Sequence, residues 1–534
     1  MDTTLHAPAV GRPHLDHGMS KRTGILFVAL MLIGLMVSAY GIFTDVDDAG
    51  SVATTWLPYG LLGIALVIAL GFEFVNGFHD TANAVATVIY THSLPANVAV
   101  VWSGFCNFLG VMLSSGAVAF SVVALLPVDM ILQVGTSNGF IMVFALLIAA
   151  ILWNLGTWYL GLPASSSHTL IGSILGVGIA SAILSGRSGL DGLDWAQVAK
   201  VGYALLLSPL VGFVCAAVLL LALRLLVKNR ELYREPQGNT PPPAWIRGLL
   251  IVTCSGVSFA HGSNDGQKGM GLIMLILVGT LPMAYALNRA VPATQTTQFV
   301  AVAQVTRDSL AQASQNAALP ADAHKVLLDF LHSKQGTPDV VPALVVVTND
   351  IANQVKNYGT LNNVPAQAMQ NVRNDMFLAS ESLNLMKKQH LDAGFSEDTR
   401  KNVAEFNRQI TEATRFIPFW VKIAVAIALG LGTLVGWKRI VVTVGERIGK
   451  THLTYAQGAS AELVTMATIG AADAFGMPVS TTHVLSSGIA GTMAANGSGL
   501  QWATVRNLIL AWVFTLPASM LLAGGLYFLF HAIF

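Results

Sequence analysis

The sequence predicts an all-α polytopic membrane protein built as an inverted-topology repeat with broken or re-entrant helices. The chain of 534 residues is 54% hydrophobic and only 11% charged, whereas soluble domains carry about 25% charged residues. Apolar runs of spanning length recur throughout, which indicates helices rather than the short alternating segments of a β-barrel, and we expect about 11–12 membrane segments. The runs lie at 24–43, 57–79, 96–125, 137–160, 163–184, 197–227, 248–262, 268–287, 417–437, 455–475, 478–495 and 503–533.

Charge and cysteine content exclude several classes of partner. The net charge of +1 argues against binding to nucleic acid. Cys106, Cys215 and Cys254 lie inside apolar runs without metal-ligand spacing, so we expect packing roles, with no disulfide and no metal or cofactor fixed in the protein. The run at 24–43 is long and no Ala-x-Ala site follows it, so we interpret it as a retained helix rather than a signal peptide.

Basic residues predict the orientation. They gather in the N-terminal tail and in the loops 224–247 and 438–450, whereas 44–56 contains three aspartates and no Lys or Arg. The positive-inside rule places the basic segments, and with them the N-terminus, in the cytoplasm. The polar segment 285–416 then lies outside, and its amphipathic patterns predict a small helical domain.

The chain is therefore expected to fall into six parts. They are an N-terminal tail with an extra helix (1–56), a first transport repeat (57–227), a cytoplasmic linker (228–247), the start of a second repeat (248–284), an extracytoplasmic insertion (285–416) and the remainder of the second repeat (417–534).

Two pairs of motifs support the repeat. NGFHDTANA at 76–84 corresponds to HGSNDGQKG at 261–269, and PASSSHTLIGSILG at 163–176 corresponds to PVSTTHVLSSGIAG at 478–491. The first pair is offset by 185 residues and the second by 315, a difference of 130 that is close to the length of the 285–416 insertion. The predicted orientation makes the two aspartate-bearing helices antiparallel, and inverted repeats of this kind are typical of secondary transporters.

The first motif pair places a carboxylate in each half. A carboxylate in the bilayer costs at least about 2.5 kcal/mol, so Asp80 and Asp265 need partners or a function. Glycines such as Gly77 and Gly262 would allow each helix to break at membrane depth and free backbone groups for an ion. We interpret the pair as cation or proton sites, although each aspartate alone could simply cap a helix. The supporting amides are Asn76, Asn83 and Asn264.

The second motif pair combines a proline with hydroxyls and a histidine. Pro163 and Pro478 suit the first turn of a helix, and a helix N-terminus with free N–H groups favours an anion. Two such ends facing each other would form a cradle for phosphate or sulfate, whereas the alternative is that the hydroxyls only join packed helices. The candidate anion-binding residues are Ser165, Ser166, Ser167, Thr169, Ser480, Thr481 and Thr482.

Three further side chains at membrane depth are candidates. His168 and His483 hold equivalent positions and could serve phosphate or proton traffic, or merely pack. Glu73 lies two turns before Asp80 in an apolar stretch, where it could be a coupling residue.

These motifs resemble the Pit family of inorganic phosphate transporters, and in detail its bacterial low-affinity type. The resemblance is carried by NGFHDTANAVAT (76–87), WNLGTWYLGLPASSSHTLIG (153–172), AHGSNDGQKG (260–269), YAQGASAE (455–462) and PVSTTHVLSSGIAG (478–491). It implies a homodimer in the bacterial inner membrane that carries phosphate, often as a neutral complex with a divalent metal such as Mg or Zn, together with protons. In sodium-coupled relatives the Asn/Asp blocks hold cations and the Ser/Thr blocks hold phosphate.

The sequence departs from the sodium-coupled pattern at Lys268. This lysine stands where the first motif has Asn83, so it would place a positive charge where a cation ligand would otherwise lie. We interpret it as favouring protons over sodium, although it could also snorkel or neutralise Asp265.

We therefore predict symport of phosphate by rocking of one half against the other. Sodium coupling, transport of another oxyanion such as sulfate, a channel and a membrane enzyme are the alternatives. A phosphatase would be expected to supply arginines to its phosphate, and neither hydroxyl motif contains one.

Overall fold

The computed structural model describes residues 15, 21–49, 57–132, 137–190, 193, 195–236, 238 and 240–534. The regular elements of this part of the chain are helices. In addition, Gly449 and Leu500 form an isolated antiparallel β-bridge. Most of the predicted N-terminal tail and the second half of the 44–56 loop lie outside the described residues.

The first half of the chain contains α1 (Lys21–Asp48), α2 (Leu57–Tyr90), α3 (Ala96–Leu113), α4 (Ala117–Val123), α5 (Val128–Leu132), α6 (Ser137–Tyr159), α7 (Ser166–Leu184), α8 (Trp195–Leu226), η1 (Arg230–Tyr233) and α9 (Ala244–Thr280). The second half contains α10 (Pro282–Tyr285), α11 (Ala293–Ala313), α12 (Ala323–Ser333), α13 (Val340–Tyr358), η2 (Leu361–Asn363), α14 (Ala366–Lys388), α15 (Glu397–Thr414), α16 (Phe419–Thr433), α17 (Lys438–Glu446), α18 (Tyr455–Ala474), α19 (Thr481–Asn496) and α20 (Trp502–Ile533).

Fewer helices qualify as membrane spans than the sequence predicted. Among the described residues, 8 helices are long and apolar enough to cross a membrane, or up to 9 if α15 and α16, which meet at a bend of 65°, count as one. The predicted segments 248–262 and 268–287 form one helix, α9, up to Thr280. Helix α19 has only 16 residues, about 24 Å at 1.5 Å per residue, which is shorter than a hydrocarbon core of about 30 Å.

The expected helix breaks at the two aspartate motifs are wrong. Asp80 lies inside the 34-residue α2 and Asp265 inside the 37-residue α9, and both helices continue through the motif. The glycines serve close helix packing instead. A Cβ atom on Gly77 would meet the backbone of Leu429 in α16, and one on Gly262 would meet the backbone of Asn107 in α3.

The breaks in the chain include the first residues of the hydroxyl motifs, so Pro163 and Pro478 precede the new helices instead of lying in their first turn as predicted. Between α6 and α7, and again between α18 and α19, the chain leaves helical geometry for a few residues and starts a new helix at the motif. Each new helix is capped by a serine, because Ser165 accepts a hydrogen bond from the backbone N–H of His168, and Ser480 accepts one from that of His483, both at 3.2 Å. Two helical hairpins therefore carry the hydroxyls.

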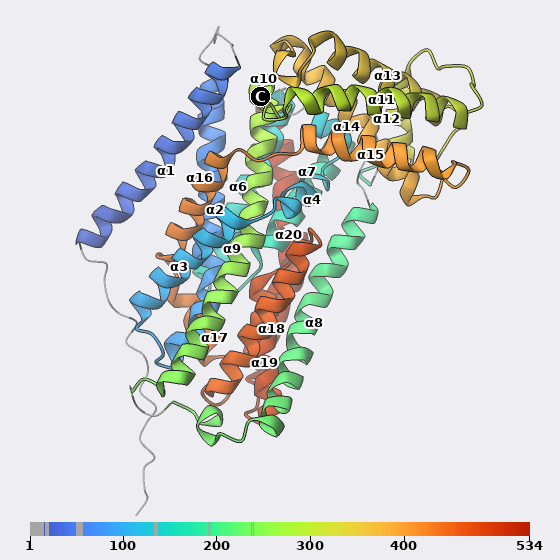
Figure 1. Ribbon diagram of the computed structural model, residues 1–534. Coiled ribbons are helices and arrows are strands. Elements are labelled where there is room, and N and C mark those ends of the chain that lie inside the picture. The colour runs from blue at the N-terminus through green and yellow to red at the C-terminus, as the bar shows by residue number, and fades with distance from the viewer. Residues whose placement is uncertain are drawn as a thin grey trace, which may run out of the picture.

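The two halves exchange equivalent contacts. Helix α2 packs on α9, and the two run in opposite directions along the long axis of the molecule (Figure 1). Helix α3 packs on α9 while α16 packs on α2, and α7 packs on α20 while α19 packs on α8. The two hairpins and both aspartate helices therefore lie in one bundle.

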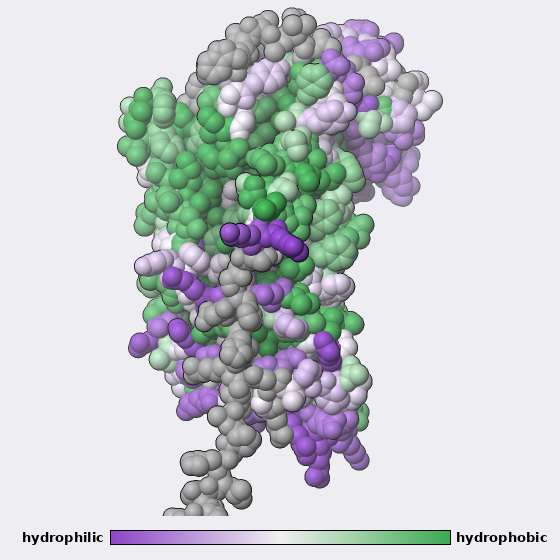
Figure 2. Space-filling view, turned by 90° about the vertical axis from the view of Figure 1, so that its left-hand side faces the viewer, coloured by the Kyte–Doolittle hydropathy of each residue, from purple (hydrophilic) through white to green (hydrophobic). Residues whose placement is uncertain are grey.

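Helices α11–α15, here called the cap, form a separate layer at one end of that bundle (Figure 1). The cap has its own core, which includes Leu310, Phe330, Ile351 and Phe406. Figure 2 shows apolar side chains over much of the bundle surface, whereas hydrophilic ones gather on the cap and at the opposite end. The apolar band suits a lipid environment.

Candidate functional site

The centre of the bundle holds the two aspartates. Asp80 is 1% exposed and Asp265 is fully buried, and their helices pack against each other. Carboxylates buried to this degree persist only with hydrogen-bonding or charged partners. The partners come from α2 and α9 themselves and from the two hairpins.

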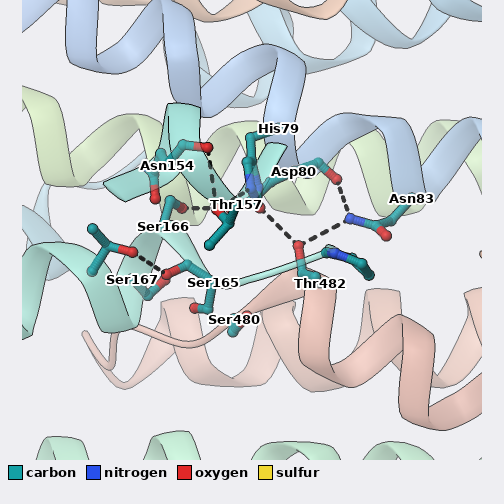
Figure 3. Close-up of polar contacts among 12 residues, drawn as sticks. His79, Asp80, Asn83, Asn154, Thr157, Ser165, Ser166, Ser167, Ser480 and Thr482 are labelled. Carbon is teal, nitrogen blue, oxygen red and sulfur yellow. Dashed lines mark hydrogen bonds and ion pairs between the residues drawn. The ribbon is translucent and has the colours of Figure 1, made fainter. Parts of the chain in front are cut away.

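Asp80 is surrounded by donors from both halves of the chain (Figure 3). The Thr482 hydroxyl donates to Oδ1 at 2.8 Å, and Ser166 donates to Oδ2. His79 Nδ1 lies 3.0 Å from Oδ1, and its Nε2 lies 3.1 Å from the Thr157 hydroxyl. Hydroxyls from α7 and α19 thus meet at a single carboxylate.

Asp265 has cationic and neutral partners. Lys268 Nζ lies 2.5 Å from its Oδ1, His261 Nε2 lies 3.5 Å from its Oδ2, and the Ser166 hydroxyl is 3.3 Å from the same oxygen. His261 and Lys268 stand four residues before and three after the aspartate, which places all three on one helical face. Ser166 therefore links the two aspartates.

Asn83 and Lys268 make equivalent contacts. Each stands three residues after its aspartate, and each reaches the hydroxyl of the opposite half. Asn83 donates to Thr482 at 2.9 Å, and Lys268 donates to Ser167 at 2.5 Å. The lysine also lies 3.2 Å from the Val479 carbonyl. Lys268 does neutralise Asp265, and it also places an ammonium at the N-terminus of α7.

Most of the other predicted hydroxyls form hydrogen bonds with backbone groups. Ser165 and Ser480 cap their helices, Ser167 donates to the Val479 carbonyl at 2.7 Å, and Thr169 donates to the Ser165 carbonyl at 2.9 Å. The buried Thr481 hydroxyl has no hydrogen-bond partner in the described part of the chain. Of the seven predicted anion ligands, Ser166 and Thr482 touch the carboxylates.

The remaining predicted residues lie around this centre. Asn264 bridges to the hairpin linker through the Met477 carbonyl at 3.1 Å and the Val479 N–H at 3.3 Å. Asn76 donates to Glu73 at 3.5 Å; Glu73 is buried against Gly269, away from the Asp80 carboxylate.

The two predicted site histidines pack together. The rings of His168 and His483 lie 4.5 Å apart, and His483 stacks on Trp512 at 4.3 Å. Their main contacts are therefore with each other and with α20.

Several side chains of the site were not among the predicted residues. His79, Thr157 and His261 contact the aspartates or their partners, and Asn107 lies 2.6 Å from His261 Nδ1. The i,i+4 spacing of His261 and Asp265 was a usable signal. Asn154 lies beside Ser166 and Thr157 (Figure 3), and neither polar atom of its buried side chain has a partner within the described residues; no local pattern indicates it.

The side chains around the two aspartates include atoms that could serve as ligands to a cation. One ligand atom each from Asp80, His261 and Asp265 lie within 4.8 Å of one another. Two carboxylates and an imidazole can hold a divalent cation or, alternatively, protons.

Comparison with known proteins agrees with this architecture. The model of the "Phosphate transporter family" matches residues 76–523, which span both aspartates and both hydroxyl motifs. The chain belongs to the phosphate transporter family. The predicted family is thus confirmed, and its members are transporters rather than enzymes.

The relatives include well-covered bacterial proteins. The low-affinity inorganic phosphate transporter PitA of Escherichia coli K12 is 41% identical over 500 residues, which cover 88% of this chain and 96% of PitA. The low-affinity inorganic phosphate transporter of Buchnera aphidicola from Acyrthosiphon pisum is 39% identical, with 88% and 96% covered. A solved structure titled "The sodium-dependent phosphate transporter" aligns with a TM-score of 0.48 and 19% identity, covering 89% of this chain and 100% of the other.

Proposed function

We propose that this chain is a secondary transporter that imports inorganic phosphate by symport with protons. The observation that carries the proposal is the meeting of two buried aspartates, from antiparallel helices, with the hydroxyl-bearing N-termini of α7 and α19. The names of the relatives, each a low-affinity inorganic phosphate transporter, support phosphate as the substrate.

Phosphate would bind between the two helix N-termini. Free N–H groups and the positive end of each helix dipole favour an anion there. Asn154 and Thr481 add buried polar atoms that lack partners within the described residues, and Lys268 adds a positive charge at the start of α7. These groups would fix phosphate without an arginine.

Proton binding would release the hydroxyls toward phosphate. Ser166 and Thr482 now donate to the carboxylates of Asp80 and Asp265. A protonated carboxyl is a weaker acceptor than a carboxylate, so protonation would free both hydroxyls and the Lys268 ammonium for the anion. Binding of phosphate and of protons would thereby be coupled.

The same aspartates would accommodate a metal carried as part of the cargo. Asp80, His261 and Asp265 offer ligand atoms to the divalent cation of a neutral metal–phosphate complex such as that of Mg or Zn. Lys268, at 2.5 Å from Asp265, opposes a cation that is not accompanied by phosphate. Unlike the Asn83 amide at the equivalent position, the Lys268 ammonium has no acceptor atom to offer as a sodium ligand. A proton needs no such set of ligands, which favours protons over sodium as the coupling ion.

An inverted repeat would perform alternating access. The exchanged contacts of α3 with α9 and of α16 with α2 relate the halves as expected for such a repeat. We place the chain in the bacterial inner membrane as a homodimer, with the N-terminus in the cytoplasm and the cap outside.

Uptake of radiolabelled phosphate into proteoliposomes tests the proposal. The purified protein is given an inward proton gradient or an inward sodium gradient, with and without Mg²⁺. We expect uptake with the proton gradient and its loss in Asp80→Asn. Uptake with sodium alone would overturn proton coupling, and absence of phosphate uptake under every gradient would overturn phosphate as the substrate.

A further inference from the structure

A cavity lies between the cap and the bundle, outside the central site. Its volume is about 290 Å³, and it is bounded by α4, α5, α9, α12, α14 and the segment that follows α15. None of the aspartates, histidines or hydroxyls of the central site lines it. The function of this cavity must therefore be inferred from the residues that line it.

The cavity has two chemically different walls. The bundle supplies an apolar wall, which includes Phe120, Leu126, Met274 and Val278. Among the described residues that line the cavity, the cap supplies most of the polar groups, with four basic side chains and one acidic one. They are Lys334, Arg373, Lys388, Arg415 and Glu381.

Arg373 indicates that the ligand of this cavity is an anion. This half-buried guanidinium lies over the Phe377 ring at 5.1 Å and donates to the Asn374 side chain at 3.3 Å. Within the described residues it forms no ion pair with a carboxylate, whereas Arg415 is paired with Glu381 at 3.0 Å. Desolvation, together with the nearby Arg415, lowers the pKa of Arg373 to about 10. A bound anion would relieve both effects.

We propose that this cavity binds a phosphoryl group through Arg373 and the neighbouring basic side chains of the cap. The phosphoryl group belongs either to an anionic phospholipid, whose chains would lie on the apolar wall, or to inorganic phosphate. Arginine suits both, because its planar guanidinium binds phosphate oxygens in pairs. The volume exceeds the roughly 30 Å³ of one water about tenfold, which leaves room for more than a small ion.

Variants of two residues test the site in the full-length protein. Arg373→Gln removes the charge, and Arg373→Lys retains it. Asn384→Asp adds a negative charge in the cavity at an exposed position, where the residue already accepts a hydrogen bond from Asn407 at 2.7 Å, so folding should be preserved. Arg400→Gln, on the exposed surface of α15, is the matched control.

Two probes distinguish the sources of the phosphoryl group. Short-chain phosphatidylglycerol, compared with short-chain phosphatidylcholine, is titrated into protein in neutral detergent and followed by native mass spectrometry. Radiolabelled inorganic phosphate is followed by equilibrium binding, which counts phosphates per chain. Thermal unfolding without ligand verifies that each variant is folded.

The outcomes are distinct. If the ligand is a lipid, phosphatidylglycerol binds about tenfold more weakly to Arg373→Gln and Asn384→Asp, which corresponds to the loss of one charge-assisted contact. Arg373→Lys, which keeps the charge but not the paired contacts, loses less affinity, and Arg400→Gln keeps the wild-type affinity. If the ligand is free phosphate, the wild type binds one more phosphate per chain than Arg373→Gln. Unchanged phosphatidylglycerol affinity and unchanged phosphate stoichiometry in folded Arg373→Gln and Asn384→Asp would overturn the proposal. Uptake in proteoliposomes, measured separately, reports on the central site.

Discussion

Ser166 has the most consequential position of any single residue in the site. Its hydroxyl donates to Asp80 and lies 3.3 Å from Asp265, so one side chain of the first hairpin contacts both aspartate helices. A hydroxyl has a single proton to donate. In the proposed mechanism, Ser166 therefore donates either to a carboxylate or to phosphate, depending on whether the carboxylates carry protons.

Ser166→Ala should weaken phosphate transport without unfolding the protein. A hydrogen bond to a charged group contributes about 1.5–3 kcal/mol, so phosphate uptake at low substrate concentration should fall roughly tenfold or more. Ser173→Ala is the matched control, because Ser173 is also buried in α7 but donates to the Thr169 carbonyl within its own helix. Equal uptake by both variants in proteoliposomes would exclude Ser166 as a ligand.

Lys268→Asn should change the ion dependence of uptake. The substitution removes the ammonium 2.5 Å from Asp265 and restores the residue type found at Asn83. Without that charge, a sodium ion would no longer be repelled from the aspartates, so we expect sodium-stimulated phosphate uptake in the variant. The same substitution at Lys200, exposed on α8, should leave the ion dependence unchanged. An unaltered ion dependence in Lys268→Asn, with no stimulation by sodium, would remove the argument that this lysine selects the coupling ion.

At the scale of helices, the small residues determine how closely the elements pack. Gly176 in α7 is placed so that a Cβ atom would meet the backbone of Met520 in α20. Gly77 and Gly262 have the same role between the aspartate helices and their neighbours. Such close contacts are how membrane helices associate without a hydrophobic driving force.

Gly176→Ala should therefore destabilise the protein. The added methyl group meets backbone atoms that cannot move aside, and overpacking of this kind costs about 1–3 kcal/mol. Gly156→Ala in α6 is the matched control, because nothing lies within 4 Å of its added Cβ and alanine favours helix. Thermal unfolding in detergent should show a lower midpoint for Gly176→Ala and an equal or higher one for Gly156→Ala. A Gly176→Ala midpoint equal to that of the wild type would show that α7 and α20 can separate at little cost.

The helical elements also show where sequence reasoning succeeded and failed. The hydroxyl motifs were correctly placed at helix starts, but Pro163 and Pro478 lie two residues before the capping serines rather than in the first turn as predicted. The glycines of the aspartate motifs were misinterpreted as breaks, because a glycine that permits a break and one that permits close packing look alike without the neighbouring helix. His261 reaches Asp265 within its own helix, at an i,i+4 spacing that the sequence does show. Asn154 joins the site from a different helix, which no local pattern reports.

The whole molecule combines two halves that exchange equivalent helix contacts with a cap on one end. The apolar band separates the cap from the opposite, basic end, where the loops after α8 and α16 lie (Figures 1 and 2). Arg400 is exposed on the cap, and Arg234 is exposed in the loop between α8 and α9. These positions therefore report on opposite sides of the membrane.

Cysteine labelling in intact cells tests the proposed orientation. A membrane-impermeant maleimide should label Arg400→Cys from outside, because we place the cap in the extracytoplasmic space, and should reach Arg234→Cys only after the cells are permeabilised. The unmodified chain is the control, since Cys106 and Cys254 are buried and Cys215 lies within the apolar helix α8. The reverse pattern would place the cap and its basic cavity in the cytoplasm and overturn the proposed orientation. Labelling of both positions in intact cells would instead contradict the separation of the two ends by a membrane.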